Sequence, residues 1–107
     1  MLLAWVILVV SAMFEAMWAS ALDRMAEGTI TLLNVISFVV GSIISVGGLY
    51  LALRDLPVGT SYAIWVGIGA TTTVLWAAFA GVETLTALKL VFIGMIVAGV
   101  AGLKIVS

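Results

Sequence analysis

Short polar stretches divide the sequence into four long apolar runs, and these runs leave little choice of fold. They cover about residues 2–22, 30–53, 60–80 and 87–106. Each run approaches or exceeds the ~20 residues that a helix needs to cross the hydrocarbon core of a bilayer. An open sheet would leave backbone groups unpaired in lipid, so helices are expected. The sequence therefore predicts an all-α membrane protein, with residues 1–107 forming one domain of four transmembrane helices joined by short loops.

The composition supports this class and excludes several functions. Of the 107 residues, 65% are hydrophobic and only 8% are charged, a balance that does not suit the surface of a soluble domain. Cysteine and histidine are both absent, which excludes disulfide bonds, the usual zinc sites and haem ligation by histidine. A net charge of −1 without a basic cluster offers nothing to a nucleic acid. We expect no cofactor, no metal ion and no enzymatic activity.

One carboxylate, Glu15, lies in the middle of the first apolar run, between Leu2 and Leu22. A glutamate is costly at membrane depth, and such residues commonly serve as proton relays or counter-ions. Burial disfavours the charged form of a carboxyl group, and a second carboxylate nearby disfavours it further. A site of this kind can exchange protons near physiological pH. Glu15 is therefore the first candidate for a functional residue.

Helical projection gives Glu15 a set of possible neighbours. On the second predicted helix, polar and small residues form one stripe: Asn34, Ser37, Gly41, Ser45, Gly48 and Ala52. Polar groups at this depth should face protein or a water-filled cavity rather than lipid. Ser45 is thus a candidate hydrogen-bond partner for Glu15 or for its ligand. On the first helix, Glu15 shares one side with Ser11, Ala12, Trp18 and Ala19.

The third predicted helix presents a broad aromatic face that includes Tyr62 and Trp65. Aromatic residues one turn inside a helix are also typical of the belt at the membrane interface, and this alternative stays open. Gly67 and Gly69 follow directly, and two glycines so close together weaken a helix and let it bend. We interpret this pair as a hinge beside a cavity wall.

The fourth predicted helix has small residues along one side, including Gly94, Ala98 and Ala101. Small residues at this spacing let helix backbones approach closely in lipid. The partner is either another helix of the same chain or a second subunit. We favour the second subunit, because four helices are few for enclosing a polar cavity alone.

The loop charges do not fix an orientation in the membrane. One end of the predicted bundle receives Arg54 and Lys104, and the other receives Arg24 and Lys89. This balance gives the positive-inside rule nothing to act on. It indicates either weak topology signals or a chain that inserts both ways and pairs as an antiparallel dimer.

Several of these residues carry a resemblance to a known family. Phe14-Glu15 with Trp18, the run Leu56 to Ala70 (LPVGTSYAIWVGIGA) and the closing Gly102-Leu103-Lys104 resemble the small multidrug resistance family. The tryptophan three residues after the glutamate is similar to the guanidinium exporter subtype rather than to the promiscuous quaternary-ammonium subtype. The resemblance covers nearly the whole chain.

The resemblance implies a dual-topology, antiparallel homodimer in a bacterial inner membrane, in which both first-helix glutamates share one site and exchange protons for a cationic substrate. Glu15 would bind protons and substrate, Trp18 and Ser45 would hydrogen-bond it, and Tyr62 and Trp65 would form aromatic walls. A guanidinium ion has a planar fork of donors that a carboxylate can accept bidentately, and aromatic faces attract such a cation. Since proton and cation compete for the same carboxylates, a proton gradient can drive export.

Two alternatives and two departures accompany this prediction. The alternatives are an exporter of hydrophobic quaternary ammonium ions and a non-transporting subunit that packs on a larger membrane partner. Asp23 stands where guanidinium exporters usually carry lysine, and Ala12 stands where a glycine is common. Asp23 can alter the topology bias, which keeps a heterodimer with a paralogue open. Ala12 can narrow the site.

Overall fold

The computed structural model describes residues 2–107, and these residues fold into helices joined by short loops. The helices are α1 (Leu2–Met13), α2 (Glu15–Ala26), α3 (Leu32–Leu53), α4 (Val58–Phe79) and α5 (Ala87–Val106). Because α1 and α2 continue one another, the described residues contain four helices long and apolar enough to cross a membrane, the first of them Leu2–Ala26. The predicted all-α membrane fold of four spanning helices is confirmed.

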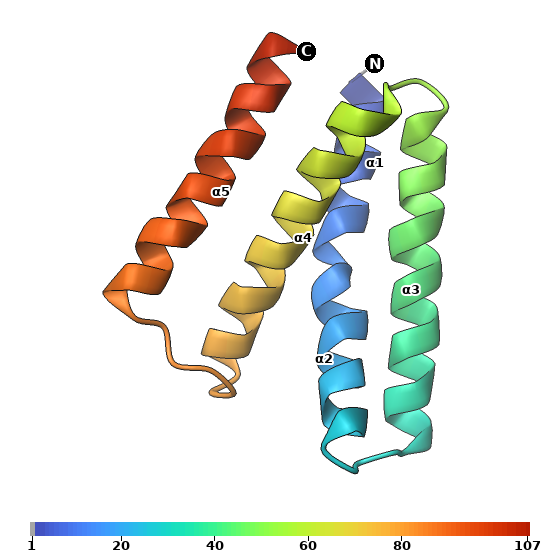
Figure 1. Ribbon diagram of the computed structural model, residues 1–107. Coiled ribbons are helices and arrows are strands. Elements are labelled where there is room, and N and C mark those ends of the chain that lie inside the picture. Colours follow the sequence, from blue (N-terminus) through green and yellow to red (C-terminus); the bar gives the residue numbers. More distant parts are fainter. Residues whose placement is uncertain (1) are drawn as a thin grey trace.

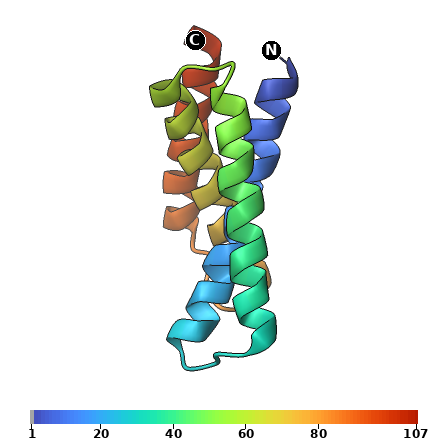
Figure 2. The ribbon, with the colours of Figure 1, turned by 90° about the vertical axis from the view of Figure 1, so that its right-hand side faces the viewer.

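The four spans lie side by side, and the chain reverses direction at each loop (Figure 1). The two ends of the chain lie at the same end of the bundle in both views (Figures 1 and 2). The bundle is flat, with extents of 42 × 33 × 17 Å. The α1–α2 span packs against both α3 and α4, whereas α5 packs against α4 at the edge. The four spans of a single chain therefore form a flat layer rather than a closed bundle.

The first span continues to Ala26, beyond the end near Leu22 that the charges at Asp23 and Arg24 suggested. Neither residue prevents helix formation, and both belong to the last turn of α2. The stop comes instead at Gly28, whose φ of +102° is a left-handed conformation that favours glycine. The next helix, α3, is capped by Thr31, whose side chain accepts a hydrogen bond from the Asn34 backbone nitrogen at 3.2 Å.

The first span is interrupted at Phe14, one residue before Glu15. The Phe14 N–H donates to the Ser11 carbonyl at 3.2 Å, and the Met17 N–H donates to the Phe14 carbonyl at 3.1 Å. Both bonds join residues three apart, so one tight turn replaces the regular α-helical spacing. Glu15 is consequently the first residue of α2 and sits beside a local change of backbone geometry.

The core lies between the α1–α2 span, α3 and α4. Its buried hydrophobic residues are Ala4, Leu8, Ala12, Leu49, Ala52, Leu56, Ile64 and Trp65. Small residues on α1 let α3 and α4 approach closely, and the large side chains of Leu8, Ile64 and Trp65 fill the remaining space. This packing fixes the position of the span that carries Glu15.

The last helix, α5, has no buried residue. It touches α4 where Val100 packs against Gly67, and it reaches α1 where the Lys104 ammonium lies 4.6 Å from the centre of the Trp5 ring. Most of its apolar surface, including Leu90, Val91 and Met95, is therefore exposed in the single chain.

Candidate functional site

The carboxylate of Glu15 packs against Gly69 of α4. A side chain at position 69 would overlap the carboxylate oxygen Oε2, so only glycine leaves room for it. This oxygen is buried and has no hydrogen-bond partner among residues 2–107. Because an unpaired buried carboxylate oxygen is costly, it requires a proton, a water molecule or a cation. The structure therefore places an acceptor without a partner at the centre of the first membrane span.

Ser45 lies on the face of α3 that packs against this region. A Cβ at Gly41, one turn earlier, would lie 3.1 Å from the Trp18 backbone nitrogen, and one at Gly48 would overlap Ser11. Ser45 stands between these two glycines on the same face, and so at the level of the interruption at Phe14. Its side chain is fully buried, and its hydroxyl has no partner among the described residues. Ser45 and Glu15 therefore approach one region without a hydrogen bond between them.

The two indoles of the predicted site also carry unpaired donors. Trp18 is half-buried and meets Phe38 edge to face, with 6.4 Å between ring centres. Trp65 is only 6% exposed and stacks on Tyr62, with 5.9 Å between ring centres and 24° between ring planes. The Nε1 atoms of both tryptophans are buried without a partner within residues 2–107. Two donors thus accompany the acceptor oxygen of Glu15.

Tyr62 differs from Trp65 in exposure. It is 52% exposed, so one face of the stacked pair is covered by protein and the other is open in the single chain. An open tyrosine face can receive a cation or another apolar surface. Trp65 precedes Gly69 by one turn on the same side of α4, so the stacked pair lies about one turn from the contact between Gly69 and Glu15.

Six buried polar side-chain atoms have no hydrogen-bond partner within the described chain, and most belong to the predicted site. They are Glu15 Oε2, Trp18 Nε1, Ser45 Oγ, Ser61 Oγ, Trp65 Nε1 and Thr71 Oγ1. Each such atom costs about 1–3 kcal/mol unless something pairs with it. Acceptors and donors together suit a ligand that offers both a charge and hydrogen bonds, or water.

The glycines predicted as a hinge lie within one continuous helix, α4. Both make close contacts: Gly69 with Glu15, and Gly67 with Val100 of α5. Whether α4 bends there stays a prediction. The small residues predicted to bind a second subunit, Gly94, Ala98 and Ala101, are exposed on α5, and a Cβ at Gly94 would meet open space.

Sequence reasoning missed two contacts of this site. The first is the contact between Gly69 and the Glu15 carboxylate. The one hint of it in the sequence was a glycine one turn after Trp65. The second is the T-shaped contact between Phe38 and Trp18. It could have been suggested by the polar stripe on α3, because Phe38 borders that stripe about one turn before Gly41.

Comparison with known proteins places the chain in a family. Residues 3–96 match the family described as Small Multidrug Resistance protein. The chain is 37% identical over 105 residues to a protein of Proteus vulgaris named "Guanidinium exporter", covering 98% of this chain and 100% of that protein. It is 35% identical over 103 residues to a protein of the same name from Citrobacter freundii, covering 96% of this chain and 97% of that protein.

A similarly named protein of Yersinia pestis is 36% identical over 105 residues, covering 98% of this chain and 100% of that protein. The family match and these nearly full-length relatives agree with the four membrane-spanning helices. They describe a multi-pass protein of a bacterial inner membrane that transports rather than catalyses. The chain belongs to the small multidrug resistance family of membrane transporters.

Proposed function

We propose that this protein exports guanidinium or small substituted guanidinium cations in exchange for protons, with Glu15 binding proton and cation in turn. The observation that carries the proposal is the buried Oε2 of Glu15, which lies against Gly69 and has no partner among residues 2–107. The relatives named "Guanidinium exporter" support the choice of cation.

The proposed binding step uses the chemistry of a planar cation. A guanidinium ion can donate two parallel hydrogen bonds to the Glu15 carboxylate, a pairing that a quaternary ammonium ion cannot make because it has no N–H. Ser45 and Trp18 orient the carboxylate by donating hydrogen bonds to it. The stacked pair of Tyr62 and Trp65 attracts the cation through its ring faces.

The proposed coupling follows from competition. A carboxylate that has taken up a proton cannot hold the cation, and a carboxylate that holds the cation resists protonation. Proton entry from one side therefore releases the cation on that side. We propose that a second, antiparallel copy contributes its own Glu15 to the same site, because the single chain is flat and leaves Glu15 partly exposed.

The test is transport by purified protein in liposomes, with a panel of guanidinium, methylguanidinium and tetraethylammonium at two pH values. We expect proton-coupled transport of the first two and weak transport of the third. Glu15→Gln should abolish transport and its dependence on pH. The matched control is Glu27→Gln, because Glu27 is an exposed carboxylate at the surface end of α2.

Two results would contradict the proposal. Sustained proton-coupled guanidinium uptake by Glu15→Gln would remove Glu15 from the mechanism. Strong transport of tetraethylammonium with poor transport of guanidinium would assign the protein to the quaternary-ammonium exporters.

A further inference from the structure

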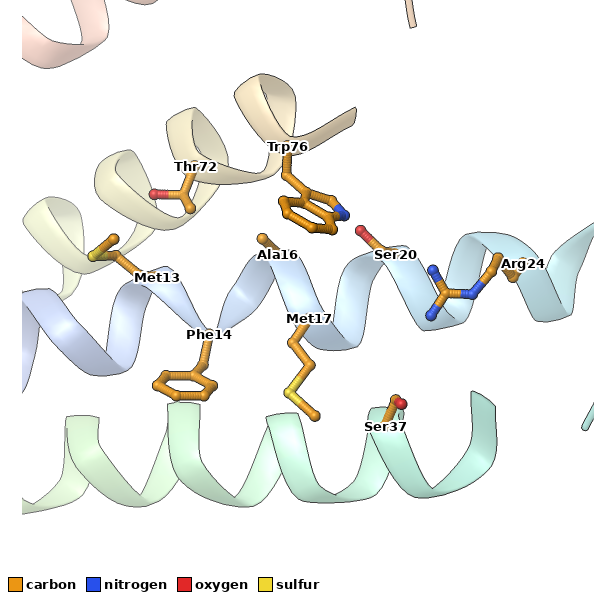
Figure 3. Close-up of a pocket in the computed structure, with 9 residues that line it drawn as sticks. All are labelled: Met13, Phe14, Ala16, Met17, Ser20, Arg24, Ser37, Thr72 and Trp76. Carbon is orange, nitrogen blue, oxygen red and sulfur yellow. The ribbon is translucent and has the colours of Figure 1, made fainter. Parts of the chain in front are cut away.

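A groove of about 500 Å³ lies beside α2, between α3 and α4. Figure 3 shows the side chains that line it: Met13, Phe14, Ala16, Met17, Ser20, Arg24, Ser37, Thr72 and Trp76. At ~100° per residue, Arg24 and Glu15 lie on opposite sides of the helix. Along α2 the groove therefore lies on the side away from Glu15, and its lining is mostly apolar.

The groove has the depth of one leaflet of a bilayer. It extends from Met13, near the interruption of the first span, to Arg24, close to the loop end of α2. Eleven residues of helix at 1.5 Å each give about 16 Å. Half of a ~30 Å hydrocarbon core is about the same length. One end of the groove is thus at the middle of the membrane and the other at its surface.

Arg24, at the surface end, is held in a defined position. Its Nε donates to Asn34 Oδ1 at 2.7 Å, and Asn34 Nδ2 donates in turn to the Thr29 carbonyl at 2.8 Å. Asn34 is only 5% exposed, so this anchor is fixed by the protein. In Figure 3 the guanidinium extends back along α2 toward the middle of the groove. The hydrogen bond uses Nε and leaves the terminal nitrogens to bind an anion.

A second hollow of about 280 Å³ adjoins the groove and shares Arg24, Ser20 and Trp76 with it. Two carboxylates, Asp23 and Glu83, also line this hollow. A positive group thus stands at the surface end of the apolar groove, with negative groups next to it. A ligand that fits both has an apolar chain, a phosphate and an amine.

We propose that this groove binds one zwitterionic aminophospholipid, such as phosphatidylethanolamine, from the surrounding leaflet. One acyl chain lies along Met13, Met17 and Trp76. The phosphate accepts hydrogen bonds from the terminal nitrogens of Arg24, whose planar fork suits phosphate oxygens. The ammonium group lies beside Asp23 and Glu83. The acyl chain lies between α3 and α4, on the side of α2 away from Glu15.

The experiment is photo-cross-linking in bilayers of phosphatidylethanolamine and phosphatidylglycerol, with the adducts identified by mass spectrometry. A benzophenone amino acid replaces Met17 in the groove. In a control protein it replaces Val91, which is 57% exposed on α5. We expect phosphatidylethanolamine adducts at position 17 in excess of its share of the bilayer. At position 91 the adducts should follow the bilayer composition.

Two sets of variants test the headgroup contacts. Arg24→Gln should reduce the phospholipid adducts at position 17 about tenfold, because a charge-assisted contact to phosphate is lost, and leave those at position 91 unchanged. Asp23→Asn with Glu83→Gln should retain the adducts but remove the preference for phosphatidylethanolamine. Unaltered adduct yield and preference in these variants would overturn the proposal.

A competition experiment on the protein with native Arg24 tests the same contact if Arg24→Gln fails to fold. Replacing the phospholipids near position 17 with added diacylglycerol, which has no phosphate, should require a large excess of diacylglycerol. Equal competition by diacylglycerol would overturn the proposal. So would a position-17 adduct to a second copy of this chain, since the groove would then be a protein interface.

Discussion

Gly69 of α4 provides the surface on which the carboxylate of Glu15 rests. A methyl group at position 69 would overlap Oε2, and both residues lie near the middle of their membrane spans. The position of the acid therefore depends on the absence of a side chain on another helix. This relationship links the packing of α2 on α4 to the chemistry proposed for Glu15.

Gly69→Ala should displace the Glu15 side chain and weaken guanidinium binding by roughly tenfold, or ~1.4 kcal/mol. It should also destabilise the fold by about 1–3 kcal/mol, the usual cost of overpacking. Isothermal titration and thermal unfolding in detergent measure the two effects. The control is Gly59→Ala in the same helix, where a Cβ meets open space. Equal guanidinium affinities in the wild type and Gly69→Ala would show that binding does not depend on the contact between Gly69 and the Glu15 carboxylate.

Gly48→Ala should destabilise the packing of α1 on α3, because the new methyl group would overlap the Ser11 side chain. We expect a loss of about 1–3 kcal/mol in the free energy of unfolding. The adjacent Gly47→Ala meets open space and should change stability little or raise it. Adding Ser11→Gly to Gly48→Ala should restore part of the loss in a double-mutant cycle. If Ser11→Gly restored no stability, the loss in Gly48→Ala would not come from overlap with Ser11.

Ser45→Ala and Ser61→Ala form a matched pair, because both hydroxyls are fully buried and lack a partner within the described chain. Removing an unpaired hydroxyl should leave stability nearly unchanged in both. Only Ser45→Ala should weaken guanidinium binding, by about fivefold or ~1 kcal/mol, the usual value of one hydrogen bond. Binding assays at fixed pH separate the two. A similar loss in Ser61→Ala would mean that both serines act through packing.

Ala98→Phe on α5 should weaken association of two chains, because small residues let helices approach in lipid. Energy transfer between labelled chains in liposomes measures this association. Single cysteines for labelling can be introduced freely, since the sequence has none. The control is Val97→Phe, at a neighbouring residue that is 49% exposed on a different side of α5. If both variants associate like the wild type, α5 does not hold the second copy through this stripe.

The long apolar runs were enough to predict the four spans, because length and hydropathy decide membrane insertion before any tertiary contact forms. Glu15 was identifiable for the same reason, since its cost in lipid does not depend on its neighbours. Ser45 was found by periodicity alone, and the structure buries it on the face of α3 toward α1 and α2.

Other features depend on contacts between helices and were not predictable. No glycine or proline occurs between Leu2 and Ala26, yet the helix is interrupted at Phe14. The sequence did not predict that Gly69, which we interpreted as part of a hinge, makes a close contact with Glu15. Asn34 suggested a polar face, whereas its side chain binds Arg24 and the Thr29 carbonyl at the loop. In each case the deciding partner lies on another segment of the chain.

The flatness of the bundle predicts how transport should depend on the ratio of protein to lipid. The bundle measures only 17 Å along its shortest dimension and leaves Glu15 partly exposed, so one copy does not enclose a path past this residue. If a second copy completes that path, the active fraction follows mass action in the plane of the bilayer. We expect the transport rate per chain to fall when the protein is diluted in lipid, and at low density the total rate should follow the square of the number of chains.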